Sequence, residues 1–383
     1  MRAELAPLAA RYDVVVANPP YMGGNNMNRW LNGWCKKNYP DTCRDLCTCF
    51  VGRGMDLASR GGYEALITSD TCMYISSFEK MRKMLIGQTT IVAFIDTRGT
   101  NAHPDVFDAN AGWVLWLGRA DGLKGSYFKL NHSIAEKEAG YLEALADPGC
   151  GWFYRRDASA FETIPGSPIA YWASEVFIRN CITGQTIDDF SIFSGSQNIT
   201  ADNAKYLRFA WEVNFKNCND GQRWIPYAKG GEFRRWYGDI YNVVDWSESA
   251  RLYYHNNGTS NLLNEPLWYR EGITYTDITS GKAHFRFLPS GCVFDKAGPS
   301  IVGFTEHLLF SLGLFNSSVS QYYFDIFNPT IHLQARDVKA MPILLLDCDE
   351  DLISSLVSPC VQLSRRDWEQ SETCLEFVRH PML

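Results

Sequence analysis

The first 120 residues alternate apolar runs with amphipathic stretches. Four runs rich in β-branched and aromatic residues predict strands at residues 12–17, 62–68, 91–96 and 112–117. Between them, apolar residues recur at helical spacing over 45–59 and over 77–85. Strands that alternate with helices of this length predict a parallel sheet covered by helices, and therefore an α/β fold.

The pattern changes after about residue 150. Breaks rich in Gly and Pro occur at 147–151 and 164–168. Short β-like runs between 273 and 294 are then followed by a helical pattern over 306–315. We expect four parts: a first domain at 1–150, a linker at 151–190, an α+β domain at 191–345 and a helical segment at 346–383.

Composition narrows the class of protein without naming its function. The apolar fraction of 46% and the charged fraction of 21% are ordinary for a globular protein. No apolar run reaches the 18 or so residues that a membrane-spanning helix needs, and the N-terminus lacks the apolar core of a signal peptide. We therefore expect a cytoplasmic protein with no membrane partner. The net charge of −7 does not indicate nucleic-acid binding, but a binding groove needs only a local basic surface.

Twelve cysteines are present, and we interpret them as reduced thiols. Cys43, Cys47 and Cys49 form the tightest cluster, without a Cys-x-x-Cys spacing or a nearby His. We expect no metal site.

The clearest chemical motif is Asn18-Pro19-Pro20-Tyr21, directly after the first predicted strand. In an open α/β sheet, ligands bind at the carboxyl ends of the strands, where this motif lies. The alternative interpretation is a Pro-Pro turn with no catalytic role.

The motif suits methylation of an exocyclic amine, whose nitrogen is a weak nucleophile because its lone pair is delocalised into the ring. The side-chain oxygen of Asn18 and the backbone carbonyl of Pro19 can accept both amino hydrogens and turn the lone pair toward a methyl donor. Pro19 and Pro20 stiffen the loop, and Tyr21 would stack on an extruded base. Extrusion costs a few kcal/mol, and stacking returns about 1–3 kcal/mol per base.

A second candidate for the base site is Phe107, between the third and fourth predicted strands. By resemblance to adenine methyltransferases that carry an Asn-Pro-Pro-Tyr motif, we expect an aromatic ring there to close the other face of the base. A single Phe beside a strand is also typical of a hydrophobic core.

The stretch 205–237 interleaves nine aromatic residues with seven Lys or Arg and three acids, as a surface that contacts phosphates and bases would. Its candidate DNA contacts are Lys229, Arg234, Arg235 and Trp236. The alternative is a structural core edged by solvated charge.

Several segments together resemble the PglX adenine methyltransferases of BREX phage-defence systems. They lie at residues 12–23, 37–41, 75–82, 223–238, 328–330, 366–368 and 380–381. The first contains the Asn-Pro-Pro-Tyr motif, and 223–238 belongs to the aromatic and basic stretch. The resemblance covers nearly the whole chain.

This resemblance implies a partial Rossmann-like class I methyltransferase sheet followed by an α+β target-recognition domain. Residues 1–150 would be the carboxyl-terminal half of the catalytic domain, and 191–345 would recognise DNA. The implied reaction transfers a methyl group from S-adenosylmethionine to adenine N6 in double-stranded DNA with the adenine flipped out. Other BREX proteins would be partners.

The chain departs from the family pattern in its cofactor site. The family binds S-adenosylmethionine through a Gly-rich loop and three strands that precede the catalytic strand, which here begins near residue 12. The sequences at 52–54 and 229–231 lack the strand-to-helix context of such a loop. We therefore expect a fragment that lacks the binding loop and is inactive alone.

Two other functions remain open at this stage. A protein-glutamine N5 methyltransferase uses the same Asn-Pro-Pro-Tyr chemistry, but it needs little sequence after the motif. A non-enzymatic DNA-binding remnant would retain recognition without catalysis.

Overall fold

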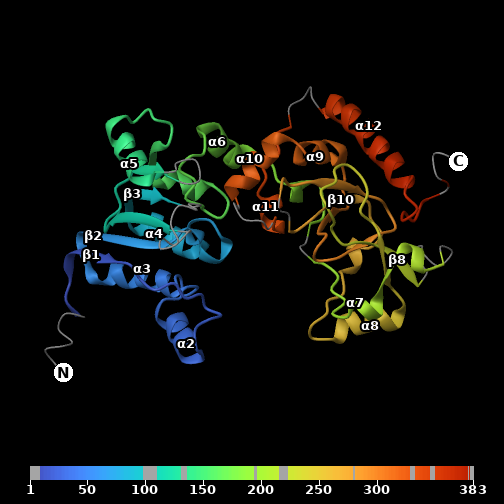
Figure 1. Cartoon of the computed structure of the whole chain (residues 1–383), viewed down its shortest axis with the longest axis horizontal. Helices are drawn as coiled ribbons and strands as arrows, with labels where there is room; N and C mark the ends of the chain where they lie inside the picture. Colours follow the sequence, from blue (N-terminus) through green and yellow to red (C-terminus); the bar gives the residue numbers. More distant parts are fainter. Residues whose placement is uncertain are drawn as a thin grey trace. The chain divides into compact units, whose positions relative to one another are not determined.

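The computed structural model describes residues 9–97, 110–130, 136–193, 196–214, 223–278, 281–327, 333–345, 350–377 and 379. It divides the chain into two compact units (Figure 1). Unit 1 is Met1–Ile182 and unit 2 is Thr183–Leu383.

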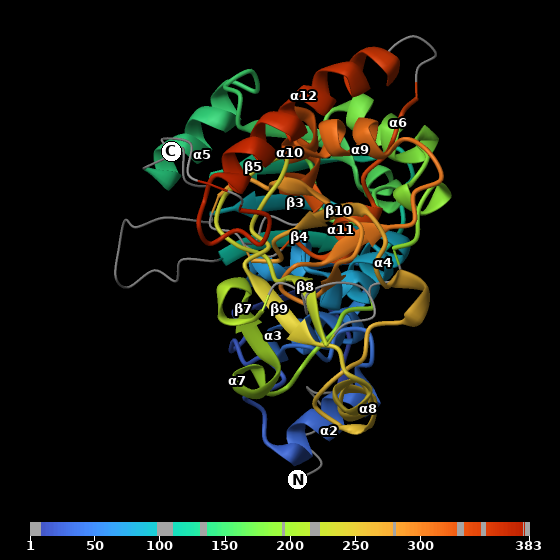
Figure 2. The same cartoon turned by 90° about the vertical axis from the view of Figure 1, so that its right-hand side faces the viewer.

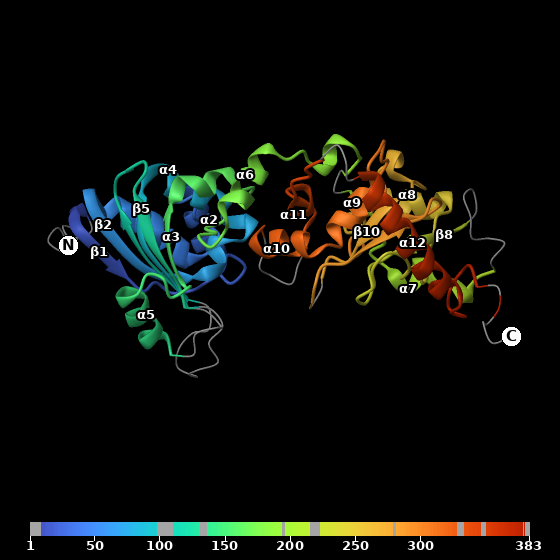
Figure 3. The same cartoon turned by 90° about the horizontal axis from the view of Figure 1, so that it is seen from above.

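Unit 1 contains a six-stranded sheet in the order β1-β2-β4-β3-β5-β6. Its strands are β1 (Tyr12–Ala17), β2 (Ala58–Ser69), β3 (Thr90–Asp96), β4 (Asn110–Trp116), β5 (Lys124–Lys129) and β6 (Phe153–Asp157). The first four match the four strands predicted from the sequence, and β1 lies at the edge of the sheet (Figure 3).

The α/β fold class is confirmed, but the expectation of a parallel sheet is wrong for two strands. β1 and β2 are parallel, as are β3 and β5, but β4 runs antiparallel to both of its neighbours and β6 runs antiparallel to β5. The sequence between β3 and β4 has no helical apolar spacing, whereas parallel strands need a crossover connection that is usually a helix. β6 lies within 151–190, the segment that we expected to be a linker.

Helices complete the described part of unit 1. They are α2 (Arg29–Asn38), α3 (Leu46–Leu57), α4 (Glu79–Gln88), α5 (Lys137–Ala146) and α6 (Glu175–Thr183). The predicted helices over 45–59 and 77–85 are confirmed as α3 and α4. Short 3₁₀ turns accompany them at η1 (Asp70–Met73), η2 (Ser76–Phe78) and η3 (Ala158–Thr163).

The two faces of this sheet differ in how they are covered. On one face, Leu66, Trp113 and Phe94 lie in register and are buried. α3 packs there against β1 and β2, and α4 against β3.

On the opposite face, which we call the open face, Val16, Ala65, Val114 and Ala93 lie in register. α5 covers only the β5 end of this face, where its Tyr141 packs against Phe128. The side chain of Val16 is 73% exposed. Sheets with parallel strands normally have both faces covered, so an exposed apolar face of this kind is unusual.

Unit 2 contains two small sheets, in the orders β11-β10-β13 and β12-β8-β9-β7. Their strands are β7 (Leu207–Phe209), β8 (Trp224–Ala228), β9 (Asn242–Asp245), β10 (Gly272–Tyr275), β11 (Phe285–Leu288), β12 (Val293–Phe294) and β13 (Ser300–Val302). The short β-like runs predicted between 273 and 294 correspond to β10, β11 and β12.

The helices of unit 2 are α7 (Asn203–Tyr206), α8 (Glu248–Asn256), α9 (Leu308–Phe315), α10 (Ser318–Phe327), α11 (Ala335–Lys339) and α12 (Glu350–Glu369), with 3₁₀ turns η4 (Ile187–Asp189), η5 (Ala210–Glu212) and η7 (Glu265–Leu267). α9 confirms the helical pattern predicted over 306–315. α12 packs beside α9 (Figure 2). The main core of the unit is rich in aromatic and branched residues, among them Ile225, Tyr227, Val244, Trp246, Tyr254 and Phe294.

Within the described ranges, no helix combines the length and the apolar character that a bilayer crossing requires. The same residues contain no group of three or more His, Cys, Asp or Glu side chains placed to hold a metal ion. Cys43, Cys47 and Cys49 are free thiols, and the last two are buried.

Candidate functional site

The predicted motif forms the loop that leaves the carboxyl end of β1. Asn18 is exposed, Pro19 is buried and Pro20 is exposed, so the loop is anchored by one proline while the asparagine faces outward. Among the described residues, the Asn18 amide has no hydrogen-bond partner. It borders a cavity of about 470 Å³ at the end of the open face, lined otherwise by apolar or small residues: Val16, Ala17, Ala65, Leu66, Ile67, Ala93, Ile95, Gly112, Trp113 and Val114.

The loop is held against the start of α3. The backbone N–H of Met22 donates to the Asp45 carboxylate at 3.1 Å, and the N–H of Leu46 donates to the Met22 carbonyl at 3.0 Å. Asp45 also caps α3, since its carboxylate accepts from the N–H of Cys47 at 2.9 Å. One carboxylate therefore fixes the helix start and the end of the motif loop together.

Tyr21 lies half-buried and close to the neighbouring strand. Its hydroxyl donates to the backbone carbonyl of Ile67, at the carboxyl end of β2, over 3.4 Å. Burial raises the pKa of the Tyr21 phenol, and the nearby Cys47 and Cys72 raise it further. The phenol is therefore protonated at neutral pH and acts as a donor.

Some expected features lie outside the described residues. Phe107, the candidate for the second face of the base, is one of them, and residues 328–330 are another. The proposed role of Phe107 at the base site stays a prediction.

The aromatic residues of 205–237 divide into two groups. Tyr206, Tyr227 and Tyr237 are buried, so the structural-core interpretation holds for them. Others are exposed, with Phe209, Trp211 and Phe233 showing 46%, 52% and 60% of their surface.

The four predicted DNA contacts are unequally available. Lys229 lies 3.6 Å from the Asp295 carboxylate. Arg234 forms ion pairs with Asp239 at 3.8 Å and with Asp367 at 3.1 Å, and its guanidinium lies over the Trp368 ring. These two cations are therefore already neutralised within the protein.

Arg235 and Trp236 complete the predicted set. The Arg235 guanidinium lies 5.5 Å from the centre of the Phe233 ring, and no ion pair of Arg235 occurs in the described ranges. Trp236 is half-buried, with a left-handed backbone at φ 76°. Both lie in one loop, Lys229–Asp239, between β8 and β9.

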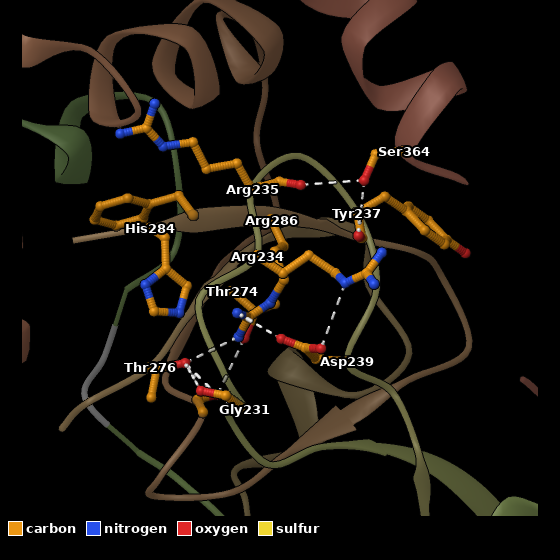
Figure 4. A network of polar contacts seen from close by, with 12 residues as sticks. Gly231, Arg234, Arg235, Tyr237, Asp239, Thr274, Thr276, His284, Arg286 and Ser364 are labelled. Carbon is orange, nitrogen blue, oxygen red and sulfur yellow. Dashed lines mark hydrogen bonds and ion pairs between the residues drawn. The ribbon is translucent and has the colours of Figure 1, made fainter. Parts of the chain in front are cut away.

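A buried ion pair lies beneath this loop (Figure 4). Arg286 of β11 is 1% exposed, and its Nη1 lies 3.0 Å from Oδ2 of Asp239. Burial raises the pKa of Asp239 and lowers that of Arg286, and each partner opposes the shift of the other. Burial and the Arg286 charge lower the pKa of His284, which is therefore neutral at pH 7.

The sequence reasoning missed three residues that shape these sites. Asp45 was recoverable, because Asp directly before a run with helical apolar spacing is a preferred N-cap residue. Arg286 was not, because its partner Asp239 is 47 residues away and nothing local couples them. Phe233 was counted among nine aromatics without a signal that it would be exposed.

Comparison with known proteins finds similarity to a restriction-modification methylase family and to adenine-specific methyltransferases. The family described as Eco57I restriction-modification methylase matches residues 7–103. Adenine-specific methyltransferase PglX of Lacticaseibacillus casei (strain Zhang) is 30% identical across 98% of this chain, and adenine-specific methyltransferase BrxX of Escherichia coli O9:H4 (strain HS) is 29% identical across 100% of it. The resemblance to PglX inferred from the sequence is thus confirmed. The chain spans about a third of the length of each relative, 33% and 32%.

A solved structure shares the fold across both units. The type IIL restriction-modification enzyme MmeI, determined in complex with DNA, aligns with 92% of this chain and 49% of its own, with a TM-score of 0.60 and 11% sequence identity. At this identity the likeness concerns the fold.

Proposed function

Because this chain is related over nearly its whole length to the PglX and BrxX adenine-specific methyltransferases, we propose that it is the part of a DNA adenine-N6 methyltransferase that holds the target base and contacts the DNA. The enzyme would act in phage defence or restriction-modification, together with other defence proteins. The observation that carries the proposal is the Asn18 amide, which has no hydrogen-bond partner in the described part of the chain and borders an open cavity.

The roles of the loop residues follow from their chemistry. The Asn18 side-chain oxygen and the Pro19 carbonyl accept the two amino hydrogens of a flipped adenine, so that the nitrogen lone pair points at the methyl donor. The buried Pro19 and the Asp45 contact hold these acceptors in place, which matters because a misplacement of about 1 Å can cost 100-fold in rate. Tyr21 offers a ring for the base.

S-adenosylmethionine supplies the methyl group, bound to a positively charged sulfur. The residues described here fit it only in part. Among the described residues, Asn18 is the sole polar one that lines the 470 Å³ cavity, and none of them is an acid that could bind ribose hydroxyls. We infer that the cofactor loop belongs to the polypeptide that covers the open face. A calorimetric titration in which this chain alone bound S-adenosylmethionine with micromolar affinity would overturn that inference.

The central experiment measures transfer of radiolabelled methyl groups to adenine-containing duplex DNA. The chain is assayed with and without the cofactor-binding portion of a PglX relative, and methylation is expected only with both. Asn18→Ala should lower the complemented rate about 100-fold or more. Asn26→Ala is the matched control, because Asn26 is also exposed and lies in the same loop.

The outcomes separate the candidate functions. DNA binding without methylation, even after complementation, would favour the non-enzymatic DNA-binding remnant. This alternative function is retained because the cavity lining is apolar or small apart from Asn18. Equal rates for Asn18→Ala and Asn26→Ala would contradict the catalytic role of the motif.

A further inference from the structure

The loop Lys229–Asp239 has a backbone that most sequences would not adopt. Trp236 and Asp239 have positive φ angles of 76° and 64°, as do Gly230 at 72° and Gly238 at 121°. A left-handed conformation costs a residue other than glycine about 1–3 kcal/mol and persists only where its surroundings impose it. Contacts within unit 2 therefore hold this loop in one backbone conformation.

Arg286 is the centre of the contacts that hold it (Figure 4). Its Nη1 lies 3.0 Å from Asp239 at the end of the loop, and its Nη2 donates to Thr276 Oγ1 over 3.2 Å. That hydroxyl oxygen in turn accepts from the backbone N–H of Gly231, at the start of the loop, over 3.2 Å. One buried guanidinium thus connects both ends of the loop.

The backbone of β11 fixes the middle of the loop. The N–H of Trp236 donates to the Phe285 carbonyl at 3.0 Å, and the N–H of Phe287 donates to the Trp236 carbonyl at 2.8 Å. These bonds flank Arg286, so the strand that carries the guanidinium also grips the strained residue.

α12 holds the far side of the loop. The hydroxyl of Ser364 donates to the backbone carbonyls of Arg235 and Tyr237 at 3.1 and 3.0 Å (Figure 4). Arg234 pairs with Asp239 and with Asp367 of α12. Arg234 is therefore part of the support.

Two side chains of the loop, the exposed Phe233 and the half-buried Arg235, make none of the side-chain hydrogen bonds or ion pairs that hold the loop within the described residues. Phe233 is 60% exposed, although burying it would have been favourable. The Arg235 guanidinium lies over its ring, while the neutral imidazole of His284 contacts the ring at a centroid distance of 5.2 Å. An exposed aromatic ring beside an arginine is a combination that proteins use on DNA, where the ring stacks or wedges at a base step and the guanidinium meets a phosphate.

We propose that Phe233 and Arg235 form the DNA-contacting tip of this loop, and that Arg286 is the positioning residue that presents them. This inference rests on the proposed DNA function. Under this proposal, Arg234 supports the loop and does not contact DNA.

The first test measures affinity for duplex DNA by fluorescence anisotropy across a salt series. Arg235→Ala should weaken binding about 10-fold and reduce the salt slope by about one, because one phosphate contact is lost. Phe233→Ala should weaken binding about 5-fold or more with an unchanged slope, because stacking involves no counterion release. Arg234→Ala should lower Tm and leave the slope unchanged.

Lys124→Ala is the matched control, an exposed cation at the amino end of β5 in unit 1, and it should change neither quantity. A wild-type chain that binds no DNA would overturn both this inference and the DNA part of the proposed function. A wild-type chain that binds, with Phe233→Ala and Arg235→Ala binding equally well, would overturn this inference alone.

The positioning role needs a local signal. Position 233 is replaced by 4-trifluoromethylphenylalanine, and its ¹⁹F resonance is recorded with Arg286 and with Arg286→Lys, which keeps the charge but loses the fork that reaches Asp239 and Thr276. We expect a shifted or broadened resonance and weaker DNA binding below the melting transition. If Arg286→Lys fails to fold, the double variant Arg286→Met with Asp239→Asn removes both buried charges and serves instead. An unchanged resonance with unchanged affinity would show that Arg286 does not position the tip.

Discussion

At the scale of single residues, Glu64 is unusual because its ionisable carboxyl is fully buried. Its carboxyl lies on the covered face of β2 with no accessible surface, and neither oxygen has a hydrogen-bond partner among the described residues. Burial raises the pKa of Glu64 from 4.5 to about 9. The folded chain therefore keeps this group protonated at pH 7, whereas the unfolded chain ionises it.

This difference predicts a pH-dependent cost. Because the pKa of Glu64 is higher in the folded chain, the unfolded chain gains stability as pH rises from about 4.5 to about 9. At pH 7 the cost to the fold is about 3 kcal/mol. We expect Glu64→Gln to raise the free energy of unfolding in urea, and to raise it more at pH 8 than at pH 5.

Glu143→Gln is the control, because Glu143 is exposed on α5 and should have no such effect. An equal effect of Glu64→Gln at both pH values would contradict the prediction.

At the scale of elements, the start of α3 and the motif loop act as one piece. Asp45 accepts from the backbone N–H groups of both Cys47 and Met22, and Thr48 closes the capping box. The loop geometry therefore depends on a helix cap that lies outside the motif itself.

Asp45→Ala tests this coupling. Loss of the cap should lower the free energy of unfolding by about 1–2 kcal/mol. It should also speed hydrogen exchange of the Met22 amide, which loses its acceptor. Asn28→Ala removes the cap of α2, where Asn28 accepts from the N–H of Leu31, and should leave Met22 unaffected. Unchanged Met22 exchange in Asp45→Ala would count against the coupling.

At the scale of the molecule, the open face of unit 1 is the surface that we expect a partner to cover. β1 is an edge strand, with Val14 and Val16 exposed by 58% and 73%. An exposed apolar edge of a sheet tends to pair with other chains. The same surface ends at Asn18, so whatever covers it also encloses the candidate base site.

We predict that the chain by itself associates through this surface. Val14→Lys with Val16→Lys should shift sedimentation velocity profiles toward the monomer, because the charges oppose burial of the edge. The same double variant should abolish complementation by a cofactor-binding portion. Val176→Lys with Ile182→Lys, at exposed apolar positions of α6, is the control and should change neither. Association that persisted in the β1 variant would locate it elsewhere.

Local patterns determined much of this protein. The strands β1 to β4 and the helices α3, α4 and α9 follow from the sequence, because β-branched runs and helical apolar spacing are properties of consecutive residues. The Asn18–Tyr21 motif follows from its place after a strand, and the relationship to PglX follows from several short segments.

Tertiary structure alone decided the rest. The antiparallel direction of β4, the bareness of the open face and the buried Arg286–Asp239 pair depend on residues that are far apart in sequence. It also separated Arg234, which is held within the protein, from Arg235, its neighbour in the chain. Composition and spacing treat two adjacent arginines alike, whereas burial and charge pairing depend on which other segments the fold brings beside each one.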